Sequence, residues 1–152
     1  GSSGPVGPLG AASARDRGTE DAEAAESAEE AWARALRAAV HEESAALDRS
    51  VGADGGRIAV ITPHPGRDVA LLREDPGLAA AMEAPGGDVL RSRLLVVSPV
   101  LSKGLEFDVV VLVDPAVVGE ISAGDLYVSM TRPTRRLRVV SRAPLPEGLR
   151  RP

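Results

Sequence analysis

The stretch Leu94–Pro115, LLVVSPVLSKGLEFDVVVLVDP, decides how the rest of this chain can fold. It contains two apolar runs, 94–97 and 109–113, which are separated by a short polar segment, 98–108. Because a strand that is covered on both faces needs no polar alternation, such β-branched runs predict buried parallel strands. The polar segment is then expected at the carboxyl end of a central strand, where open α/β sheets bind their ligands.

Shorter patterns on either side predict an α/β fold with a short, mostly parallel four-stranded sheet and flanking helices. Strands are expected at 57–62, 93–98, 108–113 and 137–141. One helix is expected at 68–82, interrupted near Pro76, and an enclosed helix should begin at the capping residue Ser122 and end before Pro133. The segment 115–121 is expected to be a simple connection.

The chain divides into four segments by composition. Residues 1–18, rich in Gly, Ser and Pro, are expected to be a disordered linker or a cloning remnant, and 143–152 a tail. Residues 19–48 predict an acidic amphipathic helix, and 57–142 the α/β domain. The helix should dock through a narrow apolar edge formed by Trp32, Leu36, Val40 and Leu47.

Charge is distributed unevenly along the chain. Residues 16–48 carry ten acidic and three basic side chains, whereas 132–151 carry seven arginines and one glutamate. This asymmetry predicts different neighbours for the two ends. A solvated helix face for the acids and a solvated strand edge for Arg135, Arg136 and Arg138 are the simpler interpretation, although these arginines could also contact phosphate.

Composition also excludes several classes of protein. There is no cysteine, so disulfides and thiolate metal sites are excluded, and the two histidines have no ligand spacing. No apolar run approaches the ~20 residues of a membrane span, and no signal peptide is recognisable. The expectation is a cytoplasmic protein with no membrane partner and no metal ligands of its own.

Lys103 is singled out by composition alone. Of 18 basic residues it is the only lysine, and it stands beside Gly104, where the backbone can approach a ligand closely. A functional ammonium and an ordinary solvated loop lysine are both compatible with this position.

Two heptapeptides carry a resemblance to a known family. Ser-Lys-Gly-Leu-Glu-Phe-Asp at 102–108 resembles motif V of the superfamily 1 UvrD-like helicases, and Leu-Tyr-Val-Ser-Met-Thr-Arg at 126–132 resembles their motif VI. Both occur in the family's order. Val100 stands where the family has a histidine on its nucleic-acid side, and the local sequence is most similar to the HelD subgroup, which associates with bacterial RNA polymerase.

The resemblance implies a partial second RecA-like domain and a role for each motif residue. Glu106 would accept a hydrogen bond from the ribose hydroxyl of ATP, and Gly104 would let the backbone approach the nucleotide. Arg132, expected to point away from the helix before it, would be the catalytic arginine finger on the γ-phosphate. Lys103 and Ser98 would support the motif V loop or contact nucleic acid.

The resemblance also implies that this chain does not act alone. No Walker A sequence is present, because the single lysine stands in Ser-Lys-Gly. ATP and Mg²⁺ would therefore be bound only together with a missing N-terminal RecA-like domain that supplies the Mg²⁺ ligands. DNA and bacterial RNA polymerase are the further partners implied. The alternative is a non-catalytic module that binds RNA polymerase and keeps the motifs as scaffold.

Geometry separates these two hypotheses. In the first, Gly104, Glu106 and Arg132 converge on one exposed crevice. In the second, they are separated or are buried by packing.

Overall fold

The computed structural model describes residues 6–52 and 55–142, so the expected tail lies outside the described residues. Helix α1 spans Val6–Val51, and the chain divides into two compact units, 1–34 and 35–152. Only the part of α1 from Ala35 onward therefore belongs to the unit that contains the sheet. The helix begins well inside the segment expected as a linker, because the run from Leu9 to Arg17 is rich in Ala and Arg, which are good helix formers.

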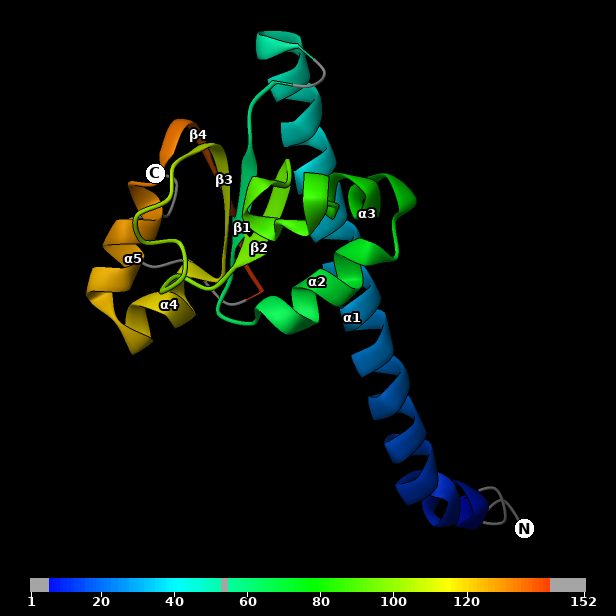
Figure 1. Cartoon of the computed structure of the whole chain (residues 1–152). Coiled ribbons are helices and arrows are strands. Elements are labelled where there is room, and N and C mark those ends of the chain that lie inside the picture. Colours follow the sequence, from blue (N-terminus) through cyan, green and yellow to red (C-terminus); the bar gives the residue numbers. More distant parts are fainter. Residues whose placement is uncertain (1–5, 53–54, 143–152) are drawn as a thin grey trace. The chain divides into compact units, whose positions relative to one another are not determined.

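Four parallel strands form one sheet in the order β2-β1-β3-β4 (Figure 1). They are β1 Ile58–Ile61, β2 Leu94–Val97, β3 Phe107–Val113 and β4 Pro133–Val140. Every neighbouring pair is parallel, which confirms the predicted fold class. β4 begins four residues before the expected 137, because a proline is tolerated at the first position of an edge strand.

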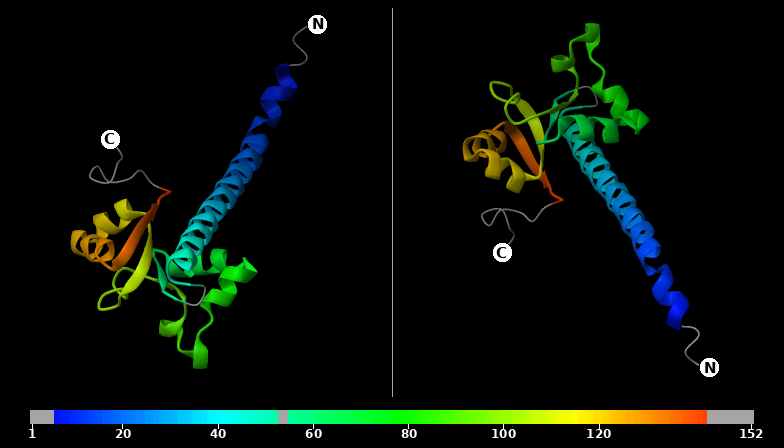
Figure 2. Two further views of the ribbon diagram at one scale, coloured as in Figure 1. Left: turned by 90° about the horizontal axis from the view of Figure 1, so that it is seen from above. Right: turned by 90° about the horizontal axis from the view of Figure 1, so that it is seen from below.

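Helices cover both faces of the sheet. α2 (Pro65–Arg73) and α3 (Pro76–Met82) lie on one face, and α4 (Pro115–Ile121) and α5 (Ala123–Met130) on the other (Figures 1 and 2). Leu105, Leu126 and Met130 pack on the second face, against a cluster of buried side chains: Ala59, Ile61, Leu95, Val97, Phe107, Val110 and Leu112. Coverage on both sides explains why the strand runs lack alternation.

Three expectations about local structure are wrong. The segment expected as a connection is helix α4, because Pro115 suits the first helical turn and Asp114 adopts the left-handed conformation (φ 48°) that turns the chain into it. α5 is capped by Ser122 as predicted, but it is not enclosed, since Tyr127 is 71 % exposed. The motif V segment follows β2, which is an edge strand and not a central one.

The acidic helix and the basic strand are each other's neighbours, contrary to the prediction. Glu43 on α1 is 1 % exposed, and Arg136 Nε on β4 lies 2.8 Å from its Oε1. Arg138 Nη1 lies 2.8 Å from Glu42 and 3.3 Å from Glu43, and hydrogen bonding to Glu42 raises the pKa of Arg138. Arg135 pairs with Asp108 at 3.3 Å. Acidic residues of α1 and basic residues of β4 therefore form ion pairs with one another within the domain.

The break between α2 and α3, which the sequence predicts near Pro76, is fixed by Asp75. Its side chain caps α3 by accepting hydrogen bonds from the backbone N–H groups of Gly77 and Leu78. His41 Nε2, on α1, lies 2.7 Å from the second carboxyl oxygen. The His41 hydrogen bond is the main cause that lowers the pKa of Asp75, and the capping bonds lower it further.

We expect the stabilising effect of Asp75 to depend on pH. Because its folded-state pKa is lowered, the ionised carboxylate stabilises the fold above the unfolded pKa of about 3.9, and this stabilisation is lost as pH falls through the folded pKa. Asp75→Asn keeps the cap but removes the charge. The Tm difference between wild type and Asp75→Asn should be present at pH 5–6 and should shrink below about pH 4. A difference that is constant from pH 6 to pH 3 would contradict this.

Candidate functional site

The segment between β2 and β3, residues 98–106, is a compact turn with internal hydrogen bonds. We call it the motif V turn. Ser98 Oγ accepts a hydrogen bond from the N–H of Leu101 at 3.3 Å. The hydroxyl of Ser102 donates to the carbonyl of Pro99 at 2.7 Å, and the N–H of Leu105 donates to the carbonyl of Ser102 at 3.1 Å. The local sequence therefore defines the shape of the turn before any ligand is considered.

Gly104 ends this turn in an open position. Its φ of +81° lies in the region that favours glycine, and a Cβ added there would meet nothing within 4 Å. Leu105 then turns inward to the core cluster, and Glu106 is exposed. The backbone at Gly104 and the carboxylate of Glu106 are thus both accessible, on either side of an anchored leucine.

Arg132 reaches this same turn from the other motif. It lies two residues beyond α5, and its Nε donates to the carbonyl of Val128 at 3.2 Å. Its Nη1 donates to the carbonyl of Leu105 at 3.5 Å, the long limit of a hydrogen bond. The side chain therefore folds back over its own helix instead of pointing away from it. Its guanidinium lies beside the carbonyl of Leu105, the residue between Gly104 and Glu106.

Lys103 forms an ion pair that sequence reasoning missed. Its Nζ lies 2.9 Å from Oδ1 of Asp125, in the first turn of α5; the lysine side chain is 51 % exposed and the aspartate 16 %. From the sequence, Asp125 is explained by its favourable position at a helix N-terminus alone. Only the fold brings it to Lys103, because both residues lie at the same edge of the sheet.

A hollow of about 160 Å³ adjoins this turn. It is lined by Pro63, Pro99, Val100, Val118, Ile121 and Asp125. Pro63 and Pro99 follow the carboxyl ends of β1 and β2, and the chain reverses its direction across the sheet between β1 and β3. Open α/β sheets generally bind their ligands at such a switch point, outside the carboxyl ends of the strands.

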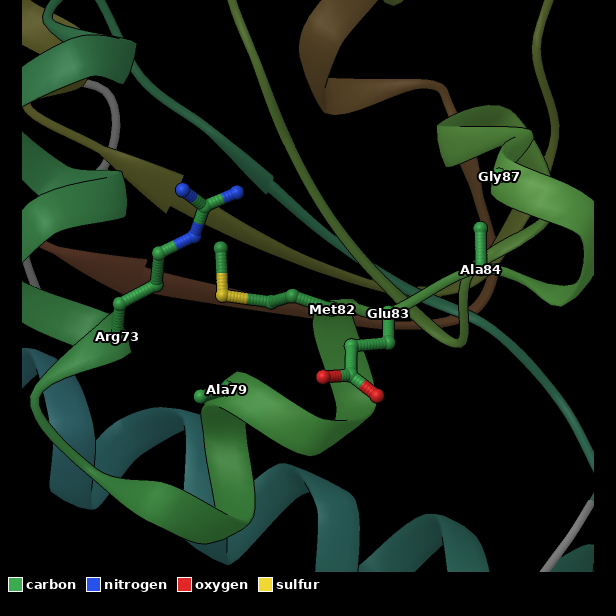
Figure 3. A pocket seen from close by; sticks show the side chains of 6 residues that line it. All are labelled: Arg73, Ala79, Met82, Glu83, Ala84 and Gly87. Atoms are coloured by element: carbon green, nitrogen blue, oxygen red, sulfur yellow. The ribbon is translucent and has the colours of Figure 1, made fainter.

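A second hollow, of about 590 Å³, lies against α2 and α3. It is lined by Arg73, Ala79, Met82, Glu83, Ala84 and Gly87, and Figure 3 shows these side chains around it. Neither hollow is lined by a residue of either motif, but the larger one lies against α2 and α3, which cover the sheet face opposite to α5 (Figure 1). We therefore place the candidate site at the motif V turn, although the hollow beside this turn is the smaller of the two.

The described residues contain neither a cluster of metal ligands nor a membrane-spanning helix. Among the side chains that the structure describes, no three His, Cys, Asp or Glu residues are arranged as they would be around a metal ion. Within residues 6–52 and 55–142, none of the helices combines the length and the apolar character needed to cross a membrane.

Comparison with known proteins gives a likeness of fold. The structure is similar to the crystal structure of the C-terminal domain of a possible DNA helicase from Lactobacillus plantarum WCFS1, with a TM-score of 0.51 and 21 % sequence identity. The match covers 71 % of this chain and 67 % of that one. No family model matches the sequence, and no curated protein matches it either.

Proposed function

We propose that this chain is the C-terminal part of an ATP-dependent UvrD- or HelD-type helicase or RNA polymerase-associated translocase. It would contribute Glu106 and Arg132 to an ATP site that a separate RecA-like domain completes. The observation that carries the proposal is the contact between the Arg132 guanidinium and the carbonyl of Leu105. Two motifs that are separate in sequence meet there, and the likeness of fold to a helicase C-terminal domain adds support.

The accessible groups fit the parts of a nucleotide. The exposed carboxylate of Glu106 can accept a hydrogen bond from a ribose hydroxyl, and the open backbone at Gly104 allows close approach. The guanidinium of Arg132 offers a fork of donors for phosphate oxygens. ATP with Mg²⁺ supplies the phosphoryl group and part of the charge neutralisation when bound.

Among the described residues, the partners of the Arg132 guanidinium are weak acceptors. Its two acceptors are neutral carbonyls at 3.2 and 3.5 Å. Hydrogen bonds to ionised groups are shorter and roughly twice as strong as those between neutral groups. A γ-phosphate within reach would therefore compete effectively for this side chain.

The alternative function, a non-catalytic protein-binding module, is favoured by a different observation. Val100, Leu101 and Ile121 are exposed apolar side chains near the motif V turn, and the charge of Lys103 is matched by Asp125. Such a surface suits a protein such as RNA polymerase better than DNA, because nucleic-acid affinity depends on free cations. The two proposals differ in whether Glu106 and Arg132 act on ATP.

Glu106→Ala tests the nucleotide role directly. In the longest natural polypeptide that contains this chain, the wild type should prefer ATP to its 2′- or 3′-deoxy analogue by about tenfold in kcat/KM, because the deoxy analogue leaves a charged acceptor without its partner. Glu106→Ala should lose that preference while kcat for ATP changes little. Steady-state ATPase assays with the three nucleotides measure both effects.

Glu120→Ala is the matched control, since Glu120 is also an exposed glutamate but lies on α4. It should keep the preference for ATP. Equal discrimination by wild type and Glu106→Ala would remove Glu106 from the nucleotide site and would favour the protein-binding alternative.

A further inference from the structure

We propose that Asp125 is a positioning residue, which holds Lys103 and thereby fixes the motif V turn against α5. The tether can be tested on this chain alone; its consequence for ATP turnover rests on the proposed function. Asp125 also lines the hollow beside the turn, but its proposed role is to act through Lys103 and not on the nucleotide. It would set the distance between Glu106, which follows the turn, and Arg132, which follows the helix.

The turn is attached to α5 at two places. Lys103 Nζ reaches Asp125 in the first turn of the helix at 2.9 Å, and the carbonyl of Leu105 accepts from Arg132 beyond the helix end at 3.5 Å. Gly104 lies between these two attachments. Because it has the most permissive backbone of the segment, loss of either attachment would let the turn swing about this residue.

Apolar packing fixes the position of α5 on the sheet, but it does not fix the position of Lys103. Leu105 packs with Leu126 and Met130 against the core cluster, so the helix and the end of the turn share one apolar contact. Residues 100, 101, 103 and 104 are exposed, whereas Ser102 between them is buried and donates a hydrogen bond to Pro99 within the turn. The Lys103–Asp125 ion pair therefore ties the exposed side of the turn to the helix.

Asp125 is itself held in place. Its backbone N–H donates to Ser122 Oγ at 3.0 Å, and its side chain is only 16 % exposed. The helix N-terminus favours its negative charge. A nearly buried carboxylate facing a half-exposed lysine is the arrangement expected when the acid positions the base.

The single lysine makes the tether directly measurable. Endoproteinase Lys-C, which cleaves after lysine, has one site in the 152-residue chain, the bond between Lys103 and Gly104. Under conditions in which the fold is intact, the rate of cleavage follows the open population of the turn. Since the lysine of the pair is about half exposed, water screens the interaction, and Asp125→Asn should accelerate cleavage about two- to fivefold.

Three variants separate the tether from general effects. Asp125→Glu should restore a rate near that of wild type, because the carboxylate is retained, and Glu120→Gln should leave the rate unchanged. Val111→Ala weakens the buried centre of β3 without touching the pair. At a temperature where all variants are folded, it should accelerate cleavage less than Asp125→Asn does.

A spectroscopic readout extends the test to Arg132. Its Nε–H resonance can be assigned by its absence in Arg132→Lys, and its hydrogen exchange should be faster in Asp125→Asn than in wild type or Asp125→Glu. The proposal is overturned if Asp125→Asn leaves both readouts unchanged, or if Val111→Ala accelerates cleavage as much. Neither readout depends on ATP. The tether can therefore be disproved while the proposed ATP site is retained, and the ATP site can be disproved while the tether is retained.

Discussion

If the proposed function holds, Arg132→Ala lowers kcat for ATP hydrolysis by about 10³- to 10⁵-fold in the longest natural polypeptide that contains this chain. In phosphoryl transfer, charge spreads over the equatorial oxygens of the transferred group, and an arginine finger stabilises it there. Because this interaction is made mainly in the transition state, KM for ATP should change much less than kcat. Steady-state kinetics with a coupled ATPase assay measures both constants.

Arg132→Lys tests whether the planar fork matters or only the charge. Lysine keeps one positive charge but offers it as a point, without the paired donors that match two phosphate oxygens. We expect it to recover only a minor part of the lost rate. Arg73→Ala is the matched control, because Arg73 is an exposed arginine on α2, on the sheet face opposite to α5. It should hydrolyse ATP as the wild type does.

Unchanged turnover in Arg132→Ala would exclude the arginine-finger role and favour the protein-binding alternative. A rise in KM with kcat preserved would instead place Arg132 in ground-state binding. Both outcomes contradict the role proposed for Arg132.

The sheet could be predicted because its strands are short buried runs. Every side chain of Ile58–Ile61 and Val109–Val113 is apolar and buried. In an α/β pattern, such runs are expected to form strands that helices cover on both faces. The sheet order could not be derived, since nothing in the run at 94–97 distinguishes an edge strand from a central one when helices cover both its faces. The motif V turn was therefore expected beside a central strand, whereas the strand that it follows, β2, lies at the edge of the sheet.

The candidate site was predictable as a set of residues but not as a geometry. Gly104 and Glu106 are adjacent in sequence, so their common exposure follows from the turn. The contact of Arg132 with Leu105, and the pair of Lys103 with Asp125, depend on how α5 packs across the sheet. Long-range pairs of this kind leave no local pattern in a single sequence.

Glu43 shows the same limit for charged residues. A glutamate among ten acidic residues on a helix has the appearance of a solvated side chain, yet it is 1 % exposed. It is buried because β4 places two arginines opposite it. Arg136 Nη2 donates to Oε2 at 3.1 Å, and Arg138 Nη1 lies 3.3 Å from the same oxygen.

Removing both arginines, in Arg136→Ala/Arg138→Ala, should lower the free energy of unfolding by about 2–4 kcal/mol. The reason is that Glu43 would remain buried as a charge without a partner. The expected loss is below that of a fully buried pair, because the two arginine side chains are 59 % and 37 % exposed and water already screens part of the interaction. Urea unfolding followed by circular dichroism measures the change.

Adding Glu43→Leu to that double variant should recover most of the lost stability. Leucine removes the uncompensated charge and fills the site with apolar atoms, and replacing a whole buried ion pair in this way is often neutral or stabilising. Glu42→Leu is the control; Glu42 pairs with Arg138 but its side chain is 60 % exposed, so its effect should stay within about 0.5 kcal/mol. If Glu43→Leu failed to rescue the double variant, the cost would lie in lost arginine packing, and the buried carboxylate would not be what makes β4 depend on its arginines.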